Sequence, residues 1–185
     1  MNAKFIAALA GLALAVLPTG AALAYTAPTK LALKEIMQTA AITPLAMQYF
    51  CAQNKNECAP DSRSQVTMTP NFMALLEQVN VRVNRSIRPR ADTVDVWELN
   101  PASGDCEDYV LSKRSALIRQ GVSAGALRVA YTHTRSGEPH AVLVVRTGSG
   151  DYVLDNLNNT VKTLQASGYT IRSMSSPNPR RWVAG

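Results

Sequence analysis

Apolar residues recur at helical spacing in the first two thirds of the chain. The clearest helix follows Thr69-Pro70, a pair that is typical of a helix start, and its apolar positions are Phe72, Leu75, Leu76, Val79, Val83 and Ile87. A shorter helix is predicted from Thr43, as N-cap, to about Gln53. A third helix is predicted over residues 105–120, because Gly121 is a favourable helix stop.

Beyond Gly121 the apolar period changes from the helical value to two. This alternation predicts strands over residues 126–133, 140–146 and 151–155, separated by turn sequences, and a further strand over 169–174. Residues 25–37 fit a helix or a strand, and residues 61–68 read as a loop. Residues 88–103 are expected to be irregular, with Val94, Val96 and Trp97 partly buried. Helices followed by an antiparallel sheet indicate the α+β class.

The N-terminal residues have the layout of a secretory signal peptide. Lys4 precedes an apolar run from Phe5 to Leu17, and Ala22-Leu23-Ala24 is a small-x-small cleavage site. The alternative is a membrane anchor, but the run is shorter than the roughly 20 residues that a span needs. We therefore predict a signal peptide over residues 1–24 and a single domain over residues 25–185, exported to a periplasm.

The composition limits the class of protein but does not indicate a function. The chain has 185 residues, of which 46% are hydrophobic and 17% charged, which suits one globular domain. Its formal net charge of +6 allows weak attraction to acidic partners. No nucleic-acid-binding motif accompanies this charge, so no nucleic-acid partner is expected.

The three cysteines divide into a close pair and a single residue. Cys51 and Cys58 are separated by six residues, and an exported protein can join them in a disulfide. A zinc site at this pair is the less favoured alternative, because no neighbouring histidine or second cysteine pair would complete it. Cys106 remains as the unpaired thiol.

The string Gly104-Asp-Cys-Glu-Asp-Tyr109 places Cys106 in the first turn of the third predicted helix. Unpaired N–H groups and the helix dipole stabilise a thiolate there, which suits a nucleophile. Neighbouring antiparallel strands would bring His140 and Asp155 side by side, with the histidine as base and the carboxylate orienting it. A buried structural cysteine, a structural histidine and a turn aspartate are the alternatives. His133, the other histidine, is expected to be exposed.

These residues resemble the bacterial transglutaminase-like cysteine proteinases, the family of the LapG-like periplasmic proteases. The resemblance runs from about Gln48 to Asn156. Its motifs are Tyr49-Phe50-Cys51, Glu57-Cys58, Val79-Asn80, Val83-Asn84, Asp92, Asp95, Trp97, Gly104–Tyr109, Lys113, His140–Leu143 and Val153–Asn156.

The resemblance implies a papain-like, transglutaminase-core fold with Cys106 as nucleophile, His140 as base and Asp155 as orienting acid. It also implies a calcium-dependent protease that cuts a large exported adhesin near paired small residues, and so controls biofilm attachment. An inner-membrane cyclic-di-GMP receptor that sequesters the enzyme is a further implied partner.

The acidic residues around Cys106 have two readings. Carboxylates close to a thiol raise its pKa, and a bound Ca²⁺ would use their oxygens and balance their charge. The resemblance makes Asp105 and Glu107 the expected calcium ligands. The alternative is helix capping, in which Asp105 caps the first turn and Asp108 bonds back to the start of the helix.

The leading hypothesis is therefore an exported cysteine endopeptidase whose oxyanion donors include the Cys106 backbone N–H. An acyltransferase or amidase would use the same triad, with an amine in place of water. A non-catalytic calcium-dependent binding module would keep the core without reactivity at Cys106.

Overall fold

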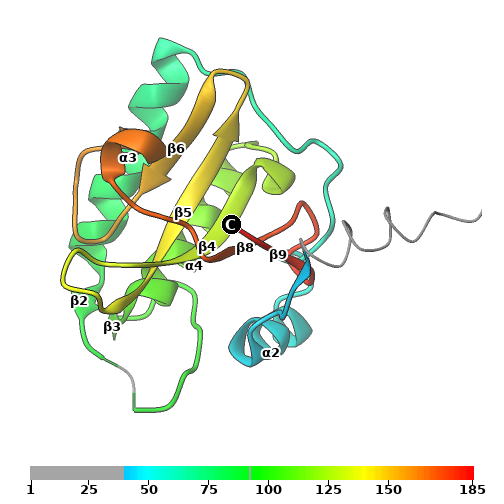
Figure 1. Cartoon of the computed structure of the whole chain (residues 1–185), viewed down its shortest axis with the longest axis vertical. Coiled ribbons are helices and arrows are strands. Elements are labelled where there is room, and N and C mark those ends of the chain that lie inside the picture. The colour runs from blue at the N-terminus through cyan, green and yellow to red at the C-terminus, as the bar shows by residue number, and fades with distance from the viewer. Residues whose placement is uncertain (1–39, 92) are drawn as a thin grey trace, which may run out of the picture.

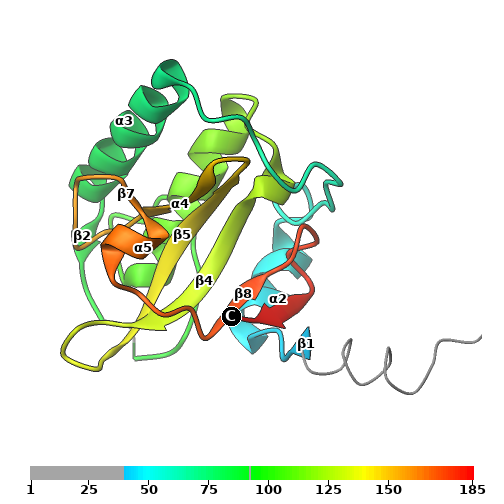
Figure 2. The same cartoon turned by 45° about the horizontal axis from the view of Figure 1, so that its top comes forward.

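A computed structural model describes residues 40–91 and 93–185, in which helices pack against a twisted, antiparallel seven-stranded sheet (Figures 1 and 2). The sheet has the order β1-β9-β8-β4-β5-β6-β7. Its strands are β1 (Ala40–Ala41), β4 (Leu127–His133), β5 (Pro139–Thr147), β6 (Gly150–Leu154), β7 (Lys162–Thr163), β8 (Ser173–Ser175) and β9 (Trp182–Ala184). A separate two-stranded parallel pair joins β2 (Arg88–Pro89) to β3 (Ser103–Gly104). This is the α+β class that the apolar periods predict.

The helices lie mainly on one side of the sheet. They are α2 (Leu45–Gln53), α3 (Pro70–Ser86), α4 (Cys106–Arg119) and the short α5 (Leu164–Ser167), with a 3₁₀ turn at Ala124–Ala126. Helix α4 packs on β4 and β5, and α3 packs on α4 (Figure 1). None of the helices in residues 40–91 and 93–185 is long and apolar enough to cross a bilayer.

Apolar side chains of the central strands point alternately to the two faces of the sheet, so these strands contribute to two cores. One face of β4 and β5 contributes side chains such as Val129, Leu143 and Val145 to the core beneath α4. The opposite face contributes Ala130 and Val142 to a smaller core, which the segment around α5 covers. Because both faces of these strands are apolar, β4 and β5 form the buried centre of the molecule.

Thr69 caps α3 as predicted, since its hydroxyl oxygen accepts a hydrogen bond from the Phe72 N–H at 3.1 Å. The predicted cap at Thr43 is wrong. Helix α2 begins at Leu45 without a side-chain cap, and the Thr43 hydroxyl donates to the Arg180 carbonyl at 3.0 Å. The Thr43 hydroxyl, which the local sequence assigns to the helix cap, is therefore used in a contact with a residue 137 positions later in the chain.

The three main strands begin and end within one residue of their predicted bounds. The expected strand over 169–174 is reduced to Ser173–Ser175, and Tyr169 lies outside it, with its ring against the smaller core and its hydroxyl bonded to Asp155. The expected partial burial of Val94 and Val96 is also wrong. Both side chains are more than half exposed, whereas Trp97 is buried and its indole N–H donates to Asp95 at 2.7 Å.

Cys51 and Cys58 form the expected disulfide, which closes a loop at the end of α2. Glu57 in this loop contacts α4 through two residues. Its backbone carbonyl accepts a hydrogen bond from the buried Arg114 guanidinium, and its carboxylate accepts one from the Ser115 hydroxyl at 2.6 Å. The disulfide loop is thereby joined to the helix that begins with Cys106. The predicted signal peptide, the ambiguous segment 25–37 and Asp92 lie outside the described residues.

Candidate active site

The first turn of α4 is fixed by a reciprocal cap. Asp105 is the N-cap residue, and its side chain bonds to the backbone N–H of Asp108. The Asp108 carboxylate accepts in return from the Asp105 N–H at 3.3 Å, and from the Glu98 N–H at 2.7 Å. A side chain at Gly104 would collide with this carboxylate, which explains the glycine. The capping alternative for Asp105 and Asp108 is therefore present in the structure.

Cys106 begins the helix, and its thiol is half-buried. The thiol donates a hydrogen bond to the Glu107 carboxylate, with Sγ and Oε2 2.9 Å apart. Burial is the largest cause of a raised thiol pKa, and the charge of Glu107 and this hydrogen bond add to it. A hydrogen bond from the Ala141 backbone acts in the opposite direction. In this arrangement Glu107 favours the protonated thiol.

His140 and Asp155 are brought together by the pairing of β5 and β6. The register places Leu143 opposite Leu154, so that His140 and Asp155 project from the same face of the sheet. The His140 Nε2 and the Asp155 Oδ1 are 2.9 Å apart, and both side chains are buried. Since Nε2 is engaged by the carboxylate, Nδ1 is the ring nitrogen available to a thiol.

Asp155 is held by more groups than the histidine alone. Its Oδ1 also accepts from the Leu157 N–H at 3.0 Å, and its Oδ2 accepts from the Tyr169 hydroxyl at 2.7 Å. Burial tends to raise the pKa of Asp155, but these hydrogen bonds and the one with His140 outweigh it and leave the pKa below its usual value. Asp155 is therefore an ionised partner for an imidazolium.

Tyr169 is the member of this group that sequence reasoning missed. Its ring packs against His140 with centroids 5.8 Å apart, while its hydroxyl contacts Asp155. Burial and the Asp155 contact raise the pKa of the Tyr169 hydroxyl, so it stays a donor. No local pattern distinguishes Tyr169 from a strand residue, because its role depends on contacts with residues 14 and 29 positions earlier in the chain.

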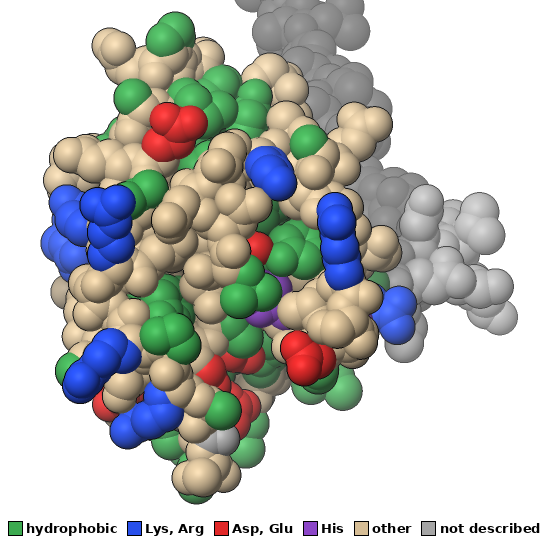
Figure 3. All heavy atoms as spheres, turned by 90° about the vertical axis from the view of Figure 1, so that its left-hand side faces the viewer, with side chains coloured by type: hydrophobic (Ala, Val, Ile, Leu, Met, Phe, Trp, Pro, Cys, Tyr) green, Lys and Arg blue, Asp and Glu red, His purple; other side chains and the backbone are tan. Residues whose placement is uncertain are grey.

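Cys106 and His140 line one cleft, a cavity of about 580 Å³. Asp105, Glu107 and Arg172 also line it, and exposed His133 lies at its edge, as expected for that histidine. Figure 3 shows a histidine side chain at the bottom of a hollow, with acidic side chains near it and lysines and arginines toward the edges of the face. A thiol and an imidazole in one cleft, with an ordered carboxylate bonded to the far side of the imidazole, can carry out acyl transfer through a thioester.

Lys113, two turns after Cys106 on α4, is an unusual buried cation. Its side chain is fully buried, and its ammonium has no hydrogen-bond partner within residues 40–91 and 93–185. The nitrogen lies 5.8 Å from the centre of the Tyr109 ring. Burial lowers the pKa of Lys113 to about 7, although the negative charge of Asp155 opposes the change.

The profile of the bacterial transglutaminase-like cysteine proteinases matches residues 37–184. The chain belongs to this family. It is therefore a member of a family of cysteine peptidases, and the resemblance inferred from the Cys106 motif is confirmed at the level of the family. No curated protein matches the chain.

Among solved structures, this family member is similar to LapG of Legionella pneumophila. The EGTA-treated structure has 24% identity and a TM-score of 0.51, and the match covers 58% of this chain and 64% of LapG, slightly under two thirds of its length. The calcium-bound structure has 20% identity and a TM-score of 0.51, and the match covers 77% of this chain and 80% of LapG. This likeness supports the transglutaminase-like α+β fold.

The residues predicted to bind calcium can be compared with calcium chemistry. Asp105 and Glu107 both line the cleft and offer the hard carboxylate oxygens that Ca²⁺ prefers. The described part of the chain contains no group of three or more His, Cys, Asp or Glu side chains arranged to hold a metal. The donor type of Asp105 and Glu107 fits calcium, which also accepts backbone carbonyls, side-chain amides and water as ligands.

Proposed function

We propose that the protein is an exported cysteine endopeptidase that uses Cys106, His140 and Asp155. The observation that carries this proposal is the buried His140–Asp155 pair at 2.9 Å, whose histidine lines the same cleft as Cys106. The pair leaves Nδ1 of His140 for the thiol, and Cys106 starts a helix whose N-terminus favours a thiolate. Membership of a cysteine peptidase family supports the same reaction.

In the proposed reaction, Nδ1 of His140 takes the thiol proton and the Cys106 sulfur attacks a peptide carbonyl. The C–N bond breaks as the imidazolium gives its proton to the leaving amine, which leaves a thioester on Cys106. A water molecule, deprotonated by His140, then hydrolyses the thioester and restores the thiol. The N–H of Cys106 has no intrahelical acceptor and is the proposed backbone donor to the oxyanion.

Asp155 has a positioning role in this scheme. It fixes the His140 ring with Nδ1 free, and its negative charge stabilises the imidazolium that forms in each half of the reaction. Its hydrogen bonds with Leu157 and Tyr169 fix the carboxylate in turn. A buried, ionised and orientated carboxylate is the arrangement that this role requires.

Calcium dependence is part of the proposal, with Asp105 and Glu107 as ligands. When bound, the ion would supply positive charge beside the carboxylates. Glu107 now accepts the thiol hydrogen bond and raises the thiol pKa. If the Glu107 oxygens bound the ion and no longer the thiol, the thiol proton would be free to pass to His140. The calcium-bound LapG structure is the comparison that supports this reading.

The proposed substrate is a large exported surface adhesin, and the proposed setting is a periplasm reached through a cleaved signal peptide at residues 1–24. An inner-membrane cyclic-di-GMP receptor is the proposed regulatory partner. These assignments rest on the family resemblance and on the leader-like N-terminus.

The test is cleavage of a proteome-derived peptide library by the purified protein with Ca²⁺ present. Cys106→Ser and His140→Ala should each remove cleavage and leave the circular dichroism spectrum unchanged, and the double variant should lose no more than either single one. Cleavage by Cys106→Ser above a no-enzyme control would contradict the assignment. Incorporation of a labelled primary amine in place of hydrolysis would instead support the acyltransferase alternative.

Chelation tests the calcium assignment separately. Excess EGTA should stop cleavage, and Ca²⁺ should restore it better than Mg²⁺, which demands a tighter octahedral site. Full activity in EGTA would contradict the calcium assignment and leave Asp105 as a helix cap and Glu107 as a partner of the thiol. A Cys106 thiol that resists iodoacetamide at neutral pH even with Ca²⁺ would favour the non-catalytic binding module.

A further inference from the structure

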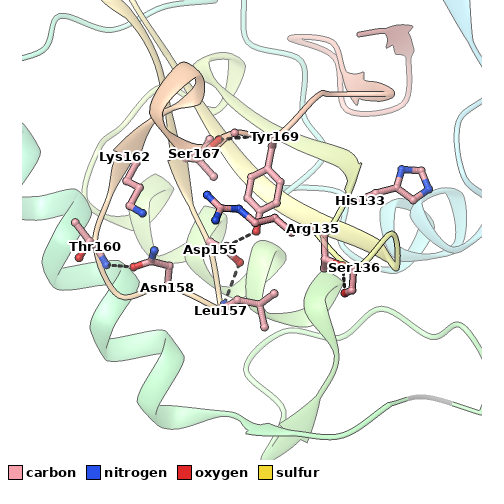
Figure 4. Close-up of a pocket in the computed structure, with 13 residues that line it drawn as sticks. His133, Arg135, Ser136, Asp155, Leu157, Asn158, Thr160, Lys162, Ser167 and Tyr169 are labelled. Carbon is pink, nitrogen blue, oxygen red and sulfur yellow. Dashed lines mark hydrogen bonds between the residues drawn. The ribbon is translucent and has the colours of Figure 1, made fainter.

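A second cavity, of about 590 Å³, adjoins the catalytic cleft. The two hollows share His133, and the second has Asp155 and Tyr169 in its wall. The remaining lining comes from the turn after β4 and from the segment between β6 and Tyr169 (Figure 4). The hydrogen-bonded Asp155–Tyr169 pair therefore faces a space that the proposed chemistry does not use.

Two cationic side chains converge on this cavity. In Figure 4 the Arg135 side chain extends over the cavity toward Tyr169, and Lys162 directs its amine into the same space. The Arg135 guanidinium lies beside Tyr169 in Figure 4, and its positive charge acts on the Tyr169 hydroxyl. No ion pair with a described acid engages Arg135 or Lys162.

The single acid in the lining cannot balance these charges. Asp155 already accepts hydrogen bonds from His140, Leu157 and Tyr169. Two cations that share a hollow repel each other, and an anion between them would relieve the repulsion. The guanidinium fork matches a carboxylate in shape, and the amide of Asn158 and the hydroxyl of Ser167 add hydrogen-bonding groups to the lining.

The catalytic cleft carries a different set of charges. Asp105 and Glu107, the proposed calcium ligands, line it with Cys106, and its described lining holds a single arginine, Arg172, and no lysine. A polypeptide that leaves this cleft past His133 would enter the second cavity. Because an extended chain advances about 3.3 Å per residue, the two hollows would be occupied by residues a few positions apart.

We infer that this cavity is a subsite for an acidic side chain, Asp or Glu, of the polypeptide substrate, placed about two to four residues from the scissile bond. Arg135 and Lys162 are its specificity-determining residues. The inference rests on the proposed endopeptidase function, and it adds a charge preference that the triad alone does not set.

The first experiment is a cleavage profile of the peptide library with Ca²⁺. The wild type should show Asp and Glu enriched at one position two to four residues from the cut. The Arg135→Gln/Lys162→Gln variant should still cleave but lose this enrichment. The control, Arg82→Gln/Arg85→Gln, removes two exposed charges from α3 and should keep it. For a matched peptide pair, the KM advantage of Glu over Gln should fall at least tenfold in the first variant, with kcat unchanged.

A binding experiment keeps the inference testable without cleavage. In ¹⁵N-labelled Cys106→Ala protein, N-acetyl-glutamate N-methylamide should shift the backbone signals of Ser136, Lys162 and Gly168 in a saturable way. The glutamine analogue should cause no such shifts. The glutamate probe should also cause none when Arg135→Gln/Lys162→Gln is added to the Cys106→Ala protein. A library that stays intact would overturn the endopeptidase function, while these shifts would still support the subsite.

Three outcomes would overturn the subsite. One is cleavage without any acidic preference, which would leave the endopeptidase function standing. The second is an acidic preference that survives in Arg135→Gln/Lys162→Gln. The third is tighter binding of inorganic phosphate than of the glutamate probe, which would make the cavity a site for free anions.

Discussion

At the scale of single residues, Asp155 depends on Tyr169 as well as on His140. We predict that Tyr169→Phe keeps the ring against His140 but removes one hydrogen bond from the carboxylate. A hydrogen bond to a charged group contributes about 1.5–3 kcal/mol, so kcat/KM should fall roughly tenfold or more.

The pH profile distinguishes this role from a packing effect. The Tyr169 hydrogen bond helps to lower the pKa of Asp155. Without it that pKa rises, the carboxylate becomes protonated at higher pH, and the acid limb of kcat/KM moves upward. Tyr49→Phe, on the exposed side of α2, is the matched control. An unchanged acid limb in Tyr169→Phe would assign the tyrosine to packing alone.

Lys113 gives a second prediction at this scale. Its pKa is about 7 in the folded protein and near 10.5 when the side chain is exposed, so the unfolded chain binds more protons between these values. Stability attributable to Lys113 therefore rises with pH from about 7 to 10.5 and is lowest below 7. The full change is on the order of 5 kcal/mol.

Urea unfolding of the Cys106→Ala protein with and without Lys113→Met measures this change. The advantage of Lys113→Met over the parent should be largest near pH 6 and should shrink toward pH 10. A difference that stays constant across this range would mean that Lys113 titrates normally. The Cys106→Ala background prevents thiol exchange with the disulfide at high pH.

At the scale of elements, the first turn of α4 combines a cap with the thiol. We predict that Glu107→Gln, in EGTA, accelerates alkylation of Cys106 by iodoacetamide, because it removes a charge that raises the thiol pKa. Each unit of decrease in that pKa gives about tenfold more thiolate at neutral pH. Glu77→Gln, exposed on α3, should leave the rate unchanged.

The same variant tests whether Glu107 is a calcium ligand. If Glu107 is a calcium ligand, Glu107→Gln should need more Ca²⁺ for cleavage although its thiol is more reactive without the ion. An unaltered calcium requirement would remove Glu107 from the ligand set. Asp105 bonds to the helix start, so its replacement perturbs both functions and is less informative.

The elements that sequence predicted well are those with a local signal. The alternation of β4, β5 and β6 and the Thr69-Pro70 start of α3 involve neighbours along the chain. The proximity of His140 and Asp155 followed from their places on adjacent strands. By contrast, β1, β7 and β9 are two or three residues long, too short for an alternating pattern to show, and β1 exists through pairing with β9 at the far end of the chain.

The errors have the same origin. Val94 and Val96 are apolar, but their segment lies outside the core. Tyr169 is of a residue type common in strands, yet its hydroxyl is bonded to the buried carboxylate of Asp155. Apolar character predicts burial only where an element presents the side chain to a core.

At the scale of the whole molecule, the Cys51–Cys58 disulfide secures the region around α2. We predict that Cys51→Ala/Cys58→Ala lowers the free energy of unfolding by about 2–3 kcal/mol, the value expected for a loop this short. Urea unfolding measures the loss, and Cys106→Ala is the control that keeps the disulfide.

Thiol counting gives a direct check of the pairing. Denatured, unreduced protein made by export should contain one reactive thiol, that of Cys106. Three reactive thiols would contradict the disulfide. A different pairing that involves Cys106 would also leave one thiol, but the alkylated residue would then be Cys51 or Cys58 in a peptide map.

Glu57 connects this disulfide loop to the helix that carries the nucleophile. The carbonyl and carboxylate of Glu57 hold Arg114 and Ser115, and both belong to the helix that begins with Cys106. A newly made chain with reduced thiols lacks that fixed loop, so its nucleophile rests on a less firmly docked helix. If the protein is exported as proposed, oxidation after export would complete the support of the nucleophile in the compartment of its proposed targets, and the chain would be only partly assembled where it is made.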